Sequence, residues 1–162
     1  MQTKTETDWY LPAALIQPPQ AVAVMRGSAA HPRIWGFVRF YALPFGTLVC
    51  AEITGLPQDS GCAFFGFHIH ENGDCGGQDA TPFADAGAHY NPKNRPHPCH
   101  AGDLPPLLIV GGYALSVFLT DRFTVEEVRD RAVMIHGKPD DFTTQPAGNA
   151  GDRIACGIIR AR

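Results

Sequence analysis

Residues 34–54 read Ile-Trp-Gly-Phe-Val-Arg-Phe-Tyr-Ala-Leu-Pro-Phe-Gly-Thr-Leu-Val-Cys-Ala-Glu-Ile-Thr, two apolar, β-branched and aromatic runs separated by Pro-Phe-Gly. In the first run alternate side chains share a face, Phe37 with Arg39 on one side and Val38 with Phe40 on the other. This period of two, with a turn signal between the runs, predicts two strands joined by a tight connection.

Short runs of the same kind recur along the chain. Gly111-Gly112 separates two of them and is the signal of a two-residue hairpin. Thr124 and Glu127 form a capping box that opens one short helical pattern, residues 124–131. Further strands are expected at residues 21–25, 64–70, 107–110, 113–119, 132–136 and 154–159. Many short strands with almost no helix predict an all-β antiparallel sandwich or barrel.

Length and composition narrow the class of protein. The 162 residues are 44% hydrophobic and 18% charged, which fits one domain with a sizeable core. A formal net charge of −3 gives no basic surface for nucleic acid. The longest nearly apolar stretch, residues 107–119, is too short for a membrane span. Residues 1–20 contain three prolines and no sustained period, so we expect an extended or disordered extension before a domain at 21–162.

The histidines are clustered rather than scattered. Six of the seven fall between positions 68 and 136, in or beside two long segments rich in Gly, Pro, Asp and Asn, residues 71–106 and 137–153. Structureless loops of this length are uncommon in a compact domain unless they are functional. The clustering therefore points to a metal site.

Two kinds of ligand set are present. Three imidazoles and a carboxylate lie within 15 residues: His89, His97, His100 and Asp103. Together they are a complete tetrahedral zinc set with no open position. His68 and His70 are two apart at the end of a predicted strand, so both imidazoles face one side. His136 ends another predicted strand and can complete an imidazole-only set, which suits Cu(II).

Five motifs, in this order, resemble those of the copper/zinc superoxide dismutase family, with features closer to its bacterial members. They are Gly66-Phe-His-Ile-His-Glu-Asn-Gly-Asp-Cys75, Gly87-Ala-His-Tyr-Asn-Pro92, His100-Ala-Gly-Asp-Leu104, Met134-Ile-His136 and Gly148-Asn-Ala-Gly-Asp-Arg-Ile-Ala-Cys-Gly157. The resemblance covers residues 21–162. It implies an eight-stranded Greek-key β-barrel, an immunoglobulin-like sandwich or barrel, with two long functional loops.

The resemblance also implies one copper ion and one zinc ion per subunit. Copper would be bound by His68, His70, His89 and His136. Zinc would be bound by His89, His97, His100 and Asp103. His89 would then bridge the ions as an imidazolate, because each of its ring nitrogens can bind a metal once deprotonated.

Two further roles rest on the resemblance alone. Arg153 matches the arginine beside the copper that attracts and orients the anion. Asp140 matches a carboxylate that accepts hydrogen bonds from one copper-binding and one zinc-binding histidine, here His68 and His97. Asp141 beside it is expected to be a solvated loop charge.

Of the five cysteines, two match a motif of the family and three do not. Cys75 and Cys156 match the family's disulfide, which would tie the first metal loop to the last strand. Cys50 and Cys62 are expected to be small buried residues. Cys99, inside the short zinc loop, departs from the family pattern and is open to three readings: an exposed thiol, a soft zinc ligand or a redox-sensitive group.

The function implied is superoxide dismutation to oxygen and hydrogen peroxide by copper redox cycling, with superoxide anion as the partner. The alternative is a non-catalytic copper- or zinc-binding module on the same scaffold, which a missing copper ligand or arginine would favour; none is missing. A homodimer is a candidate assembly, but family dimer contacts differ and are not transferred. No signal segment is visible, which favours the cytoplasm, whereas bacterial relatives are usually exported and a disulfide favours an oxidising compartment.

Overall fold

The structure is a computed structural model, and it describes residues 16–58 and 64–162. Its strands are β1 (Ala21–Gly27), β2 (Trp35–Leu43), β3 (Gly46–Thr54), β4 (Phe64–Phe65), β5 (Phe67–His70), β6 (Leu107–Leu108), β7 (Ala114–Thr120), β8 (Ala132–His136) and β9 (Arg153–Ala161). The helical elements are the 3-10 turn η1 (Ala84–Ala86) and the single-turn helix α2 (Val125–Val128). None of the helices in these described ranges has the length and apolar character needed to cross a membrane.

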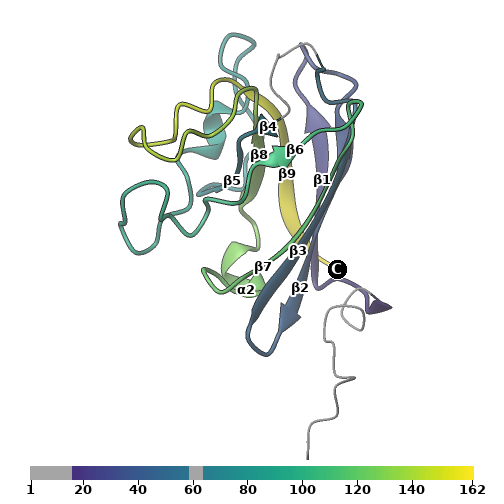
Figure 1. Ribbon diagram of the computed structural model, residues 1–162, viewed down its shortest axis with the longest axis vertical. Helices are drawn as coiled ribbons and strands as arrows, with labels where there is room; N and C mark the ends of the chain where they lie inside the picture. Colours follow the sequence, from purple (N-terminus) through teal and green to yellow (C-terminus); the bar gives the residue numbers. More distant parts are fainter. Residues whose placement is uncertain (1–15, 59–63) are drawn as a thin grey trace, which may run out of the picture.

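Seven strands form one curled antiparallel sheet in the order β5-β8-β9-β1-β2-β3-β7, and β4 and β6 form a short ladder of their own (Figure 1). The chain runs from β4 into β5 through Gly66, and β6 lies against β7. The ladder thus stands between the two edges of the sheet. This confirms the predicted all-β Greek-key architecture.

The predicted strand at residues 64–70 is two strands, so the described residues contain nine strands where eight were expected. Phe65 pairs with Leu107 in β6, whereas Phe67 pairs with Ile135 in β8. The switch occurs at Gly66, where an added Cβ would lie 2.8 Å from Cβ of Ala150. A side chain here would therefore collide with the loop before β9, a contact that local sequence patterns do not register.

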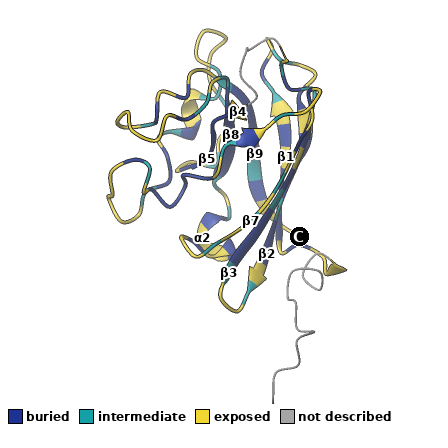
Figure 2. Cartoon of the chain, viewed as in Figure 1, coloured by how far each residue is buried: buried dark blue, intermediate teal, exposed yellow. Residues whose placement is uncertain are grey.

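The core lies inside the curl and follows the alternation read from residues 34–54. Val38 of β2 faces Ala51 of β3, and Phe40 faces Val49, and all four side chains are buried. In Figure 2 dark buried positions alternate with lighter ones along most of the strands. Burying apolar surface of this kind contributes about 25 cal/mol per Å² and is the main stabilising term of such a domain.

β5 and β8 differ from the other strands because they are buried on both faces. The loops that connect β5 with β6 and β8 with β9 lie together on one side of the sheet, to the left in Figure 1. In β5, Phe67 and Ile69 belong to the core, so the alternating His68 and His70 face the other way, under these loops. The fold therefore places the histidine pair between the sheet and its two long loops.

The local signals are confirmed at the hairpin and at the start of the helix. Gly111 and Gly112 have φ of 60° and 79°, both positive as a tight hairpin turn requires. Thr124 and Glu127 form the capping box with both reciprocal hydrogen bonds. The helix is shorter than the predicted 124–131, because Arg129 leaves the helical conformation with a ψ of 144° and Asp130 follows with a φ of 58°.

Candidate metal centre

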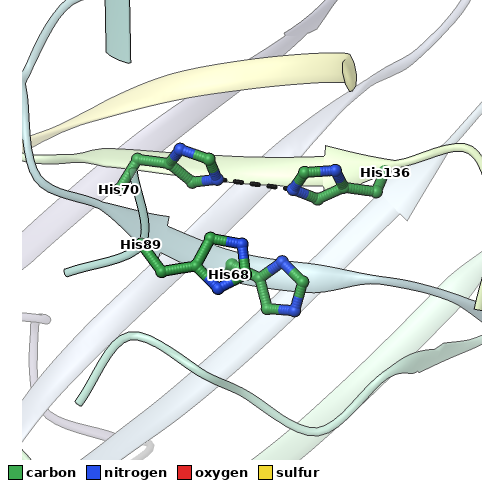
Figure 3. A group of neighbouring side chains, drawn as sticks. All are labelled: His68, His70, His89 and His136. Carbon is green, nitrogen blue, oxygen red and sulfur yellow. Dashed lines mark hydrogen bonds between the residues drawn. The ribbon is translucent and has the colours of Figure 1, made fainter. Parts of the chain in front are cut away.

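Strands β5 and β8 bring three of the predicted copper ligands together, and a loop adds the fourth. His68 and His70 project from β5, and His136 ends β8. A single β-bridge between His70 and His89 draws the loop residue alongside. Figure 3 shows the four imidazoles facing one another, with Nε2 of His70 and Nε2 of His136 3.3 Å apart. All four side chains are buried, and their ligand atoms lie within 4.8 Å of one another.

The second group surrounds the carboxylate of Asp103. Its oxygens lie 2.8 Å from Nδ1 of His89, 3.1 Å from Nδ1 of His97 and 3.3 Å from Nδ1 of His100. The backbone N–H of His100 donates to Asp103 Oδ2 at 2.9 Å, and a β-bridge from Asp103 to His68 anchors the carboxylate beside β5. These ligand atoms also lie within 4.8 Å of one another.

Four buried ring nitrogens without hydrogen-bond partners among the described residues show whether the two ligand groups fit metal ions. Within the described residues, Nδ1 of His68, His97 and His100 and Nε2 of His89 have no hydrogen-bond partner. Nδ1 of His97 and of His100 lie near Asp103 but outside hydrogen-bond geometry. A buried unsatisfied nitrogen costs about 1–3 kcal/mol, so four in one place indicate a ligand that they bind. An imidazole-only set fits copper and a His₃Asp set fits zinc.

Three histidines of the first group, His68, His70 and His136, are in the protonation state that binds metal. Burial lowers the pKa of His68 to about 4, that of His70 to about 2 and that of His136 to about 3. All three imidazoles are therefore neutral near pH 7, with a lone pair free for coordination.

Asp140 connects the two groups. Its Oδ2 lies 2.7 Å from Nε2 of His68, and its Oδ1 lies 2.9 Å from Nε2 of His97. Burial acts to raise the pKa of Asp140, but hydrogen bonds from His68, the N–H of Phe142 and His97 outweigh it and lower the pKa. An ionised carboxylate that engages Nε2 of both rings leaves Nδ1 of each for a metal.

Arg153 begins β9 and lines a cavity of about 790 Å³ together with His70, His89 and His136 of the first ligand group. One guanidinium nitrogen donates to the carbonyl of Phe83 and another to that of Gly87, both at 2.6 Å. These two bonds fix the side chain at the wall of the cavity.

The cysteines separate into one bridge and free thiols. Cys75 and Cys156 form a disulfide with an S–S distance of 2.06 Å, which ties the loop after β5 to β9. Cys99 is free and exposed, and it belongs to neither ligand group, which supports the exposed-thiol reading. Cys50 is free and half-buried rather than buried, whereas Cys62 lies outside the described residues.

Sequence reasoning missed one residue that supports the second group. Arg122 donates to the carbonyls of Pro98, His100 and Asp103 at 3.1–3.3 Å. Asp141 is exposed, as expected of a solvated loop charge, and it also accepts four hydrogen bonds from Thr143 and Thr144, which hold its pKa down to about 2. No local motif marks the position of Arg122, because its partners are backbone carbonyls about 20 residues away.

Comparison with known proteins agrees with this geometry. The family described as Copper/zinc superoxide dismutase (SODC) matches residues 34–159. The chain is 36% identical over 133 residues to a Cu-Zn superoxide dismutase of Legionella pneumophila, covering 77% of each chain. It is 36% identical over 148 residues to one of Deinococcus radiodurans, covering 80% of this chain and 79% of the other. The solved Cu/Zn superoxide dismutase of Brucella abortus superimposes with a TM-score of 0.72 at 28% identity, over 85% of this chain and 98% of that one.

Proposed function

Because the chain belongs to the copper/zinc superoxide dismutase family, we propose that its two ligand groups divide the two metals between them. Copper is bound by His68, His70, His89 and His136. Zinc is bound by His89, His97, His100 and Asp103. The protein is an oxidoreductase, and its reaction converts two superoxide anions and two protons into one molecule of oxygen and one of hydrogen peroxide.

The position of His89 carries this proposal, because it is the one residue shared by both groups. Its Nδ1 lies 2.8 Å from Asp103, while its Nε2 is buried and has no partner among the described residues. Copper, when bound, supplies the one-electron redox chemistry of dismutation. Asp103 and its neighbours fix the orientation of the His89 ring from the zinc side.

His89 is the proposed proton carrier of the site. When Nε2 of His89 is not engaged by copper, that nitrogen can take up a proton and deliver it to a reduced oxygen species. His89 lines the same cavity as Arg153, so an anion in that cavity has access to this proton. The proton would then leave with the peroxide product.

Arg153 is the proposed anion guide. Its two short hydrogen bonds to carbonyls of the loop after β5 fix the guanidinium, so little side-chain freedom is lost when an anion binds. A positive charge in a cavity with low-dielectric walls can raise the on-rate of a small anion about 10–1000-fold. Asp140 is the proposed orienting group for His68 and His97.

Metal content measured together with dismutation tests the assignment. The loaded protein should contain one copper and one zinc per chain, and pulse radiolysis should detect dismutation only when copper is present. A non-catalytic metal-binding module would contain both metals and leave the decay of superoxide unchanged. The cavity that joins His89 to Arg153 favours the enzyme, since a carrier has no use for a fixed cation beside the metal.

We also propose the bounds of the domain and a protein partner. Residues 21–162 form the metal-binding domain, with residues 1–20 as an extension before it. A second copy of the chain is the proposed protein partner: Phe64 and Leu108 are cross-strand neighbours in the β4–β6 ladder and are 45% and 51% exposed. Sedimentation equilibrium would show a mass twice that of the chain, and a single-chain mass at micromolar concentration would refute the dimer.

A further inference from the structure

Both backbone polar groups of His97 are engaged by one side chain. The N–H of His97 donates to Oε1 of Gln145 at 3.0 Å, and Nε2 of Gln145 donates to the carbonyl of His97 at 2.7 Å. His97 is 3% exposed, so neither group has water as a ready alternative. The Gln145 amide thus pairs with the His97 backbone as one strand pairs with another.

The loop segment around His97, residues 92–99, makes few hydrogen bonds that fix the position of His97. Among the described residues, the backbone hydrogen bonds within residues 92–99 and to Asn91 are turn contacts, Asn94 to Asn91 and Cys99 to Pro96. The side chain of Asn91 adds a reciprocal pair with the backbone of Arg95. These bonds shape the loop locally, but none of them fixes His97 relative to the sheet.

Hydrogen bonds within its own loop hold the backbone around Gln145 in place. Oδ1 of Asp141 accepts from the N–H of Thr143 and of Thr144, and the N–H of Gly148 donates to the carbonyl of Thr144 at 2.7 Å. The same loop carries Asp140, which engages the imidazole of His97. One loop therefore grips the ring of His97 with a carboxylate and its backbone with an amide.

We propose that Gln145 is a positioning residue of the zinc site: it fixes the backbone of His97 so that Nδ1 points at Asp103 while Asp140 engages Nε2. A ring held at one end only can pivot about its own χ angles and its peptide, and a displacement of a few tenths of an ångström spoils tetrahedral coordination. This inference goes beyond the proposed function and rests on its assignment of zinc to His97.

The test uses the full chain loaded with copper and zinc. Zinc and copper release are followed separately in the presence of excess chelator for wild type, Gln145→Ala and Gln145→Glu. The matched control is Thr143→Ala in the same loop, whose lost hydroxyl contacts Asp141 and not the zinc loop. Replacing zinc by Co²⁺ gives a second measurement, since the visible absorption of Co²⁺ reports the geometry of its ligands.

Gln145→Ala should release zinc about tenfold faster or more, the usual effect of removing a group that orients a ligand, and copper release should change less than twofold. Gln145→Glu keeps the acceptor for the His97 N–H and should fall between. The Co²⁺ spectrum should change in Gln145→Ala and not in Thr143→Ala. The proposal would be overturned if both Gln145 variants released zinc as slowly as wild type and kept its Co²⁺ spectrum. It would also be overturned if Gln145→Ala accelerated the release of zinc and of copper equally. If wild type itself takes up no zinc, the zinc assignment fails instead.

Discussion

Asp140 lies 2.7 Å from His68, a residue 72 positions away in the sequence, and its second oxygen engages His97 of the other ligand group. One buried carboxylate thus couples the orientation of a proposed copper ligand to that of a proposed zinc ligand. Its replacement should affect both metals together.

Asp140→Asn is expected to weaken binding of both metals by about tenfold or more, because an amide presents one acceptor and one donor where two acceptors are needed. Metal affinities measured by competition with a chelator check this. Asp152→Asn, the same change at an exposed position of that loop, is the control. Loss of one metal alone would show that the carboxylate orients a single histidine.

His136→Ala should abolish dismutation and leave zinc bound, since His136 belongs to the first group only. Elemental analysis with pulse radiolysis on the same sample measures both effects. The complementary variant is Asp103→Ala, which removes the one anionic ligand of the second group and should lower zinc affinity while copper remains. Near-normal dismutation by fully loaded His136→Ala would refute the copper assignment.

The metal-free protein should lose stability as the pH falls below about 6.5. The folded chain keeps His68, His70 and His136 neutral, with pKa values of about 4, 2 and 3, whereas the unfolded chain takes up protons at each near the ordinary value of 6.5. Unfolding therefore binds protons, and the free energy of unfolding should fall by up to about 1.4 kcal/mol per pH unit for each histidine between pH 6 and 4.

Urea titrations of the metal-free protein at pH 7, 6 and 5 measure this slope. Well above pH 7 these histidines should contribute little pH dependence, because they are then almost wholly neutral in both states. His136→Asn should reduce the slope by about one proton's share. Stability that is level from pH 7 to pH 5 would contradict the idea that burial keeps the rings neutral.

Arg153→Ala should lower the second-order rate constant for superoxide by about tenfold, and Arg153→Glu should lower it further. Arg39→Ala changes the net charge equally but lies in β2, away from the cavity, and is the matched control. Metal content is kept equal across the series. An unchanged rate in Arg153→Ala would remove the guiding role.

The wild-type rate should fall modestly as ionic strength rises from 0.01 to 0.1 M, over which the Debye length shrinks from about 30 to about 10 Å. The fall should be shallow because residues 137–152 supply Lys138 against three aspartates, and Glu71 lines the same cavity as Arg153. Stopped-flow measurements over this range suffice. A rate that increases with salt would indicate net repulsion of the anion.

Local patterns predicted most of the fold because the strands alternate clearly. Val38 and Phe40 are in the core as their spacing requires, and the Gly111-Gly112 turn and the Thr124 cap have the conformations expected of them. The break at Gly66 was missed because it depends on Ala150, which the fold brings close from the far end of the chain.

In the candidate site, too, some residues could be predicted from local patterns and others could not. Histidines at informative spacings, with the motifs around them, pointed to the residues that the structure brings together. Arg122 and Gln145 were missed because they act on backbone carbonyls and N–H groups of another loop, and such partners leave no residue-type signature in the sequence. Loop conformation decides these contacts, and a period of two says nothing about loops.

The four residues of β5 serve two purposes at once, since Phe67 and Ile69 are packed in the core while His68 and His70 face the loops. A one-residue slip in the pairing of β5 with β8 would exchange the two sets and bury the imidazoles among apolar side chains. An insertion or deletion within this segment would therefore disrupt both the core and the ligand group. New properties of the site have to arise in the loops above it, where a change in length leaves the alternation of the strand intact.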